Sequence, residues 1–181
     1  MTNQTAFPLS GKYRPLTPAV PLSRRAYTAF TTLGALAAGL AVILPALAIG
    51  YWLTEGAKLA DGFIMRMIAI ATALLHLLPL SWGLLKLRVC LAGFAAGRPF
   101  DGGAIAGLRD FALGMAISAL VKPFAGMLFT LAVSWEGSPK RINIEISSDV
   151  MILALFAGVV AALAWAMQKA ALIAEENSQF V

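Results

Sequence analysis

Four long apolar segments constrain the fold of this chain more than any other feature. They cover Ala26–Leu53, Gly62–Leu85, Phe111–Trp135 and Val150–Met167. A helix needs roughly 20 apolar residues to cross about 30 Å of hydrocarbon, and each segment is near that length. Hydrophobic residues make up 60% of the 181 residues, whereas soluble domains contain roughly 45–50%. We therefore expect an all-α membrane protein in which residues 26–175 form a bundle of four transmembrane helices.

The basic residues lie mainly at one set of segment ends, and this distribution predicts an orientation. Nine lie before the first segment, between the second and third, or after the fourth: Lys12, Arg14, Arg24, Arg25, Lys86, Arg88, Arg98, Arg109 and Lys169. Three lie in the other two connections: Lys58, Lys140 and Arg141. Because basic residues concentrate in cytoplasmic loops, we expect both termini and the middle connection on the cytoplasmic side of a bacterial inner membrane.

A twin-arginine export signal is an alternative reading of the first segment. Ser23-Arg24-Arg25 precedes the apolar run, and Ala46-Leu47-Ala48 resembles a cleavage site. However, the run is longer than the apolar core of a signal peptide, which has about 7–15 residues. We therefore expect the first segment to be an uncleaved span.

Two polar regions are predicted to be non-helical. Residues 1–25 contain four prolines (Pro8, Pro15, Pro18 and Pro21), which favour an extended cytoplasmic arm, either disordered or docked on a partner. In the last connection, residues 141–147 alternate between polar residues and isoleucine, which indicates a short extended segment on the periplasmic side. Residues 176–181 are expected to form a short cytoplasmic tail.

Small residues recur at every fourth position on one face of the fourth segment: Ala154, Gly158, Ala162 and Ala166. Such a face lets the backbone of a neighbouring helix approach closely. We expect this face to pack inside the bundle, and a seam between two copies of the chain is the alternative.

Three ionisable residues lie within the apolar segments: Arg66, His76 and Lys122. Arg66 is near the outer end of its segment, where a long side chain can reach the interface. His76 and Lys122 lie deeper, and no carboxylate is expected at the depth of Lys122. The alternatives for Lys122 are simple structural tolerance, a hydrogen bond to His76, contact with a lipid or partner, or a transport site. If Lys122 is only tolerated, Lys122→Met should stabilise the protein.

The sequence contains no catalytic or metal-binding constellation. Cys90 and His76 are the only cysteine and histidine, so the chain can form neither an internal disulfide nor the usual zinc or haem ligand sets. The net charge of +5 follows from basic residues at segment ends, and no groove-reading motif accompanies it. We expect a non-enzymatic protein that has no cofactor and does not bind nucleic acid directly.

The middle connection and the tail carry a family resemblance. Gly97, Pro99 and Phe100 are followed by Leu108-Arg109 and Gly114, and the chain closes on Glu175-Glu176-Asn177-Ser178-Gln179-Phe180-Val181. In these features residues 26–181 resemble the bacterial membrane family known as domain of unknown function 2975, whose members look like four-span proteins. The resemblance implies no enzyme activity. It implies a partner, since such proteins are often encoded beside a small helix-turn-helix regulator.

These features lead to one expected function and two alternatives. We expect an inner-membrane protein that binds a partner, such as a small helix-turn-helix regulator, at its cytoplasmic face. The tail is expected to fold back against the middle connection, or to form one docking surface with it. The docking residues would be Arg98, Phe100, Leu108, Arg109, Glu175, Glu176, Asn177 and Phe180. The alternatives are an accessory subunit of a larger membrane complex and a small transporter centred on Lys122 and His76.

Overall fold

Four long antiparallel helices make up the part of the chain described by the structure, a computed structural model that covers residues 22–54, 63–133 and 147–178. The helices are α1 (Arg24–Thr54), α3 (Phe63–Ala95), α4 (Gly102–Val133) and α5 (Ser148–Ser178). Each is long and apolar enough to cross a membrane. Within these residues, the predicted all-α fold with four helices that could span a membrane is therefore confirmed. The proline-rich arm before Leu22, nearly all of the predicted extended segment, and Phe180 lie outside the described residues.

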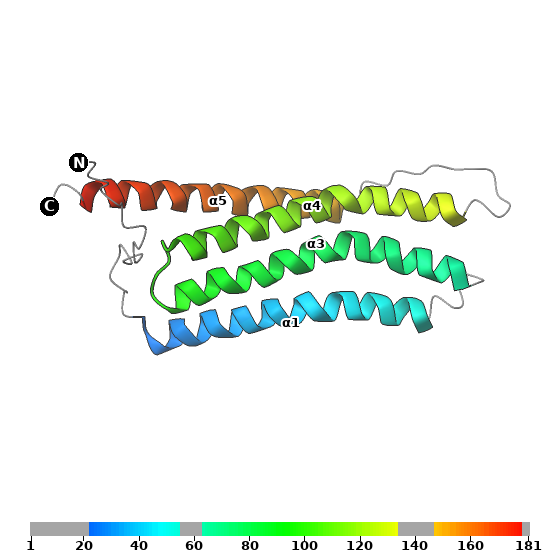
Figure 1. Ribbon diagram of the computed structural model, residues 1–181, viewed down its shortest axis with the longest axis horizontal. Coiled ribbons are helices and arrows are strands. Elements are labelled where there is room, and N and C mark those ends of the chain that lie inside the picture. The colour runs from blue at the N-terminus through cyan, green and yellow to red at the C-terminus, as the bar shows by residue number, and fades with distance from the viewer. Residues whose placement is uncertain (1–21, 55–62, 134–146, 179–181) are drawn as a thin grey trace, which may run out of the picture.

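The helices form an open bundle in which each packs mainly on its neighbour in the sequence. Helix α1 packs on α3, α3 on α4, and α4 on α5. The start of α1, the turn between α3 and α4, and the end of α5 lie at one end of the bundle (Figure 1). We refer to this end as the turn end and to the opposite end as the far end. Helix α5 begins beside the middle of α4 and continues past the turn end (Figure 1).

Short local signals fix the helix ends at the turn end. Ser23 caps α1, because its hydroxyl accepts a hydrogen bond from the backbone N–H of Ala26 at 3.3 Å. Gly97 follows α3 in the left-handed conformation, with a φ of 69°. The N–H of Arg98 then donates to the carbonyl of Gly93 at 3.0 Å, which is the Schellman arrangement of a helix end. Gly97 thus ends α3.

The helices extend beyond the predicted apolar segments at this end. Helix α3 continues from Leu85 to Ala95, and α4 begins at Gly102 rather than near Phe111. Most of the connection predicted between the second and third spans is therefore helical. Apolar composition marks the part of a helix that lies in hydrocarbon, whereas backbone hydrogen bonding continues until a residue such as Gly97 stops it.

Glycines bring α3 and α4 into close contact. A Cβ atom added at Gly114 would lie 2.6 Å from the carbonyl oxygen of Pro79 and 2.8 Å from the Cα of Gly83. One added at Gly107 would lie 2.7 Å from the carbonyl oxygen of Lys86. Backbone atoms cannot move aside as a flexible side chain can. These glycines therefore allow the close backbone approach that stabilises helix pairs in membranes.

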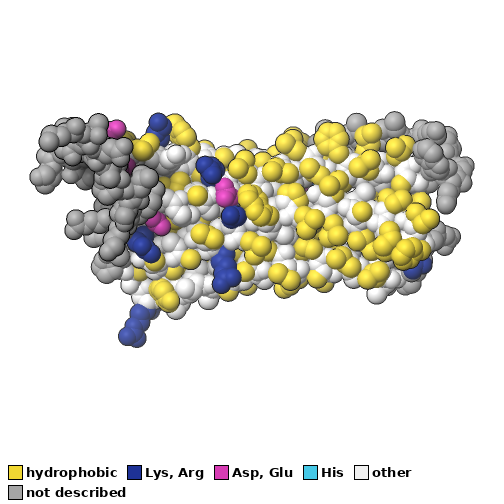
Figure 2. All heavy atoms as spheres, in the orientation of Figure 1, with side chains coloured by type: hydrophobic (Ala, Val, Ile, Leu, Met, Phe, Trp, Pro, Cys, Tyr) yellow, Lys and Arg dark blue, Asp and Glu magenta, His cyan; other side chains and the backbone are white. Residues whose placement is uncertain are grey.

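The buried core lies where α3, α4 and α5 meet. Its centre contains Phe111, Ala112, Met115, Ala157 and Val160, and leucines of α3 pack against it. Elsewhere the surface is largely apolar. Figure 2 shows hydrophobic side chains over most of the visible face, with charged side chains gathered toward the turn end. A soluble monomer rarely exposes an apolar patch larger than a few hundred Å², so this surface fits a hydrocarbon environment.

The small-residue face of α5 lies outside the bundle, and the expectation of internal packing was wrong. All four of its residues are exposed: Ala154, Gly158, Ala162 and Ala166. A Cβ added at Gly158 would meet no atom within 4 Å. Helix α5 instead buries a neighbouring face that carries Val150, Ala157, Val160 and Ala164. The side chains that α4 offers, including Phe111 and Met115, fill the space beside these residues, and sequence spacing alone does not reveal that fit.

Candidate functional site

A band of charged side chains lies on the helices near the turn end. Lys86 and Arg109 both pair with Asp110, at N–O distances of 3.8 Å and 3.4 Å. The ammonium of Lys86 also lies 5.6 Å from the centroid of the Trp82 ring, which is a cation–π geometry. Charged groups and tryptophan gather where spans meet the headgroups. The band therefore marks one membrane interface.

The opposite interface lies near Arg66. Lys86 and Arg66 are 20 positions apart on α3, which is about 30 Å at a helical rise of about 1.5 Å per residue and matches the hydrocarbon thickness. Trp52 of α1 contacts Phe129 of α4 at this end, with 5.5 Å between ring centroids. Arg66 itself is half-buried, and its Nε has no hydrogen-bond partner among the described residues.

Lys122 has a carboxylate partner that the sequence did not reveal. Its Nζ donates to Oδ2 of Asp149, in the first turn of α5, and the hydroxyl of Ser147 donates to the same carboxylate. The expectation that no carboxylate lies at the depth of Lys122 was therefore wrong. Helix α5 begins beside the middle of α4, so its N-terminal carboxylate reaches a level that the apolar segments alone place within the membrane.

The depth of this pair follows from helix geometry. Lys122 is 13 positions beyond Arg109 on α4, which is about 20 Å from the charged band. It is thus about two thirds of the way across a hydrocarbon layer of about 30 Å. A carboxylate in the first turn of a helix also interacts favourably with the helix dipole, and Asp149 occupies that position in α5.

His76 does not bond to Lys122. Its Nδ1 lies 3.4 Å from the carbonyl oxygen of Thr72, one turn earlier on α3. The region thus holds one neutralised lysine and one histidine bound to its own helix. No group of three or more His, Cys, Asp or Glu residues in the described ranges could hold a metal ion.

The predicted docking residues of the middle connection fall into two environments. Arg98 and the exposed Phe100 lie on the turn between α3 and α4. Arg109 is exposed in the charged band. Leu108 packs against the buried core, because the helix continues through this region and turns that side chain inward. Leu108 is thus a packing residue, which corrects its predicted place on the docking surface.

The tail does not fold back within the described residues. Glu175, Glu176 and Asn177 continue α5 as exposed helix. The segment consists mainly of good helix formers, such as Ala, Leu and Glu, with no glycine or proline to end it. Arg109 pairs with its neighbour Asp110 instead of a tail residue. The described part of the tail, up to Ser178, therefore continues α5 at the turn end, and Phe180, which the predicted fold-back involves, lies outside the described residues.

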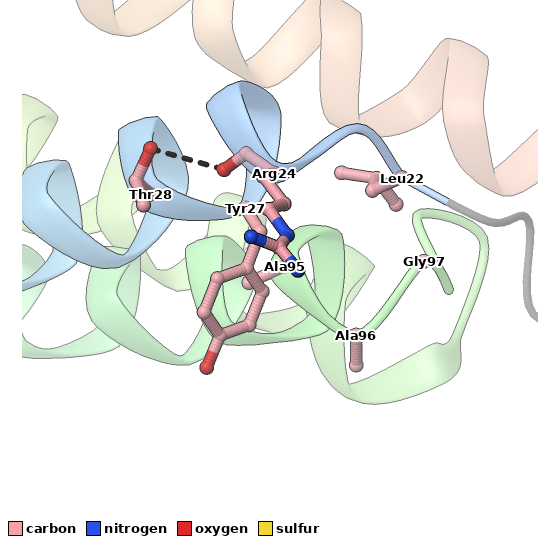
Figure 3. Close-up of a pocket in the computed structure, with 7 residues that line it drawn as sticks. All are labelled: Leu22, Arg24, Tyr27, Thr28, Ala95, Ala96 and Gly97. Atoms are coloured by element: carbon pink, nitrogen blue, oxygen red, sulfur yellow. Dashed lines mark hydrogen bonds between the residues drawn. The ribbon is translucent and has the colours of Figure 1, made fainter.

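A pocket of about 450 Å³ opens at the turn end, between the start of α1 and the end of α3. Figure 3 shows its lining residues: Leu22, Arg24, Tyr27, Thr28, Ala95, Ala96 and Gly97. The hydroxyl of Thr28 donates to the carbonyl of Arg24 at 3.1 Å (Figure 3). The sequence did not indicate this pocket, because its two walls are some 70 positions apart along the chain.

A second, more apolar groove of about 410 Å³ runs between α4 and α5. Buried alanines form its floor, including Ala112, Ala119 and Ala157. The exposed Leu113 and Leu120 stand along its α4 side, and Arg109 lies at the end nearest the charged band. On the α5 side the groove includes Ala154 and Gly158, which belong to the exposed small-residue face. This groove was also not predicted.

Comparison of the chain with family models, with curated proteins and with solved structures finds no match.

Proposed function

We propose that this chain is a non-enzymatic integral membrane protein that binds a protein partner at the cytoplasmic face of a bacterial inner membrane. The observation that carries the proposal is the exposed end of α5, residues Leu172–Asn177. Leu172 and Ile173 are 46% and 57% exposed, and the acidic Glu175 and Glu176 follow them.

The position of this segment relative to the membrane shows that its exposed apolar side chains lie outside the hydrocarbon layer. Asp149 of α5 pairs with Lys122 of the antiparallel α4, and Ala161 follows Asp149 by 12 positions while Arg109 precedes Lys122 by 13, so Ala161 is near the level of the charged band. Leu172 is 11 positions further along α5, about 16 Å beyond that level. It therefore lies outside the hydrocarbon, where a partner that covered Leu172 and Ile173 would gain the free energy of removing apolar surface from water.

The charge distribution supports a cytoplasmic turn end. Among the described residues, seven basic side chains lie at or beyond the charged band: Arg24, Arg25, Lys86, Arg88, Arg98, Arg109 and Lys169. Arg66 marks the far end, and the charge of Lys122 is neutralised by Asp149. Because basic residues are retained on the cytoplasmic side, the turn, the start of α1 and the end of α5 would face the cytoplasm.

The family resemblance supports a small helix-turn-helix regulator as the partner. Among the residues that carry the resemblance, Gly97 forms a left-handed helix end and Gly114 allows a close helix contact. These two glycines therefore have structural roles. Arg98 and Phe100 sit at the turn, and Phe100 is exposed. They are available to a partner together with the end of α5, and we include them in the proposed docking surface.

The experiment is affinity purification of the full chain in mild detergent, with mass spectrometric identification of bound proteins. The test variant is Leu172→Gln with Ile173→Gln, which keeps helix-forming residues while removing apolar contact area. The matched control is Lys169→Gln, on the same part of α5. Loss of a DNA-binding partner from the test variant alone is the expected result. Retention of every partner by a membrane-inserted test variant would refute the docking surface.

An accessory subunit of a membrane complex is the second candidate, favoured by the exposed small-residue face of α5. Such a face permits close contact with a helix of another subunit. In this case Ala162→Leu with Ala166→Leu would release co-purifying membrane proteins, and the Leu172 and Ile173 changes would not. Transport is less supported, because Asp149 supplies Lys122 with a counter-ion inside the chain and no transported anion is needed for that purpose.

A further inference from the structure

We infer that the groove between α4 and α5 is a binding site for an anionic phospholipid, with one acyl chain in the groove and the phosphate at Arg109. This site is separate from the proposed protein-docking surface. It combines an apolar channel within the hydrocarbon layer and a cation at the interface, which are the two parts that a phospholipid presents together.

The groove has the dimensions of a chain rather than of a helix. Its walls run from Arg109 to Leu120 on α4 and from Val150 to Ala161 on α5, a length of about 16 Å at a rise of about 1.5 Å per residue. The whole open space of the groove, about 840 Å³, is smaller than the roughly 1,300 Å³ that a helix of about 10 Å diameter fills over about 16 Å, so the groove cannot enclose a helix.

Small side chains create this space. Ala112, Ala116 and Ala119 line the α4 wall, and Ala154 and Gly158 line the α5 wall. Nothing lies within 4 Å of a Cβ placed at Gly158, so the space beside it is open. The lining is almost wholly apolar apart from Arg109. In a bilayer such a groove is filled by hydrocarbon, because water would find no hydrogen-bond partners there.

Charge at the turn end of the groove favours an anionic headgroup. Lys86, Arg109 and Asp110 together carry a net charge of +1. The Arg109 side chain is 64% exposed. It has five N–H donors, and the carboxylate of Asp110 is its one acceptor among the described residues. The remaining donors can bind phosphate oxygens in the bidentate geometry that arginine favours. Basic pockets between spans on the cytoplasmic side are typical headgroup sites.

Native mass spectrometry of the full chain tests the site, with phosphatidylglycerol and phosphatidylcholine of identical acyl chains added in turn. We expect a preference of about fivefold for phosphatidylglycerol, given the modest contribution of one basic residue near a membrane surface. Arg109→Gln should bring the two lipids to equal binding. Arg88→Gln, at an exposed arginine that does not line the groove, should leave the preference unchanged.

Variants that fill the groove provide the second part of the experiment. Gly158→Leu should reduce binding of both lipids, whereas Ala162→Leu, on the exposed face next to the groove, should not. If Gly158→Leu does not fold, Ala154→Leu serves the same purpose. The inference fails if the groove-filling variants bind both lipids as the native chain does, or if Arg109→Gln keeps the preference. It also fails if filling the groove abolishes a dimer and leaves lipid binding unchanged, because the occupant would then be a second copy.

Discussion

Replacing Lys122 with methionine would leave the carboxylate of Asp149 without its cation. The two side chains are 37% and 58% exposed from the chain itself, but the surface that surrounds them is apolar and faces lipid. Viewed as an isolated charge, Lys122 is a burden of roughly 2.5–3.5 kcal/mol on insertion scales, and its removal would stabilise the protein. Because Lys122 pairs with Asp149, the variant replaces a neutralised pair with a single unpaired charge. Lys122→Met should therefore destabilise the protein instead of stabilising it.

The magnitude lies between two limits. An ion pair in water contributes about 0–1 kcal/mol, and removal of one partner from a fully buried pair costs about 3–5 kcal/mol. For a half-exposed pair in a lipid-facing position we expect Lys122→Met to lower the free energy of unfolding by about 1–3 kcal/mol. Asp149→Asn should lower it by a similar amount. The double variant should recover most of the loss, since it contains neither charge.

A double-mutant cycle measures this coupling. The four proteins would be compared by reversible unfolding in mild detergent, and the coupling energy is the departure of the double variant from the sum of the single changes. A coupling of about 1–3 kcal/mol supports the pair. A coupling within about 0.3 kcal/mol of zero, or a stability gain from Lys122→Met alone, would show that the pair does not stabilise the protein.

Three further predictions concern packing and helix ends. Gly114→Ala should destabilise the protein by about 1–3 kcal/mol, because the new Cβ would lie 2.6 Å from the carbonyl oxygen of Pro79. The control in the same helix is Gly126→Ala, where the new Cβ would have no atom within 4 Å. In thermal unfolding this control should be neutral or stabilising. Val160→Ala should reduce the free energy of unfolding by about 1–2 kcal/mol, because Val160 is buried. Ala162→Leu on the exposed face should change it by less than about 0.5 kcal/mol. A larger loss from Ala162→Leu than from Val160→Ala would contradict the assignment of the buried face of α5. Ser23→Ala should lower stability by about 0.5–2 kcal/mol and loosen the first turn of α1, visible as faster amide exchange at Ala26, while unchanged exchange would show that the cap contributes nothing.

The membrane class and the number of spans could be predicted from the sequence because they depend on local composition. Each apolar segment is long enough to cross a bilayer by itself, whatever the others do. The stop at Gly97 was also predictable, since glycine is the residue that adopts the left-handed conformation at a helix end without strain. These features need no knowledge of neighbouring helices.

The positions of the helices relative to one another were not predictable from the sequence. The wrong expectations about Lys122 and about the buried face of α5 follow from this. The pairing of Lys122 with Asp149 depends on α5 beginning beside the middle of α4. The covered face of α5 depends on Phe111 and Met115 packing on Ala157 and Val160, not on the four-residue repeat of small side chains. The groove at Arg109 likewise exists only once two helices lie together. Contacts between residues distant in sequence carry each of these features.

Cysteine labelling determines on which side of the membrane each helix end lies. Single cysteines would be introduced by Phe100→Cys, Ile173→Cys and Thr54→Cys, and labelled with a membrane-impermeant maleimide in spheroplasts. The native Cys90 is buried and should remain unlabelled. If the turn end is cytoplasmic, the Thr54→Cys protein is labelled in intact spheroplasts, and the other two are labelled only after the membrane is permeabilised. Labelling of the Phe100→Cys or Ile173→Cys protein in intact spheroplasts would contradict the cytoplasmic position of the turn end.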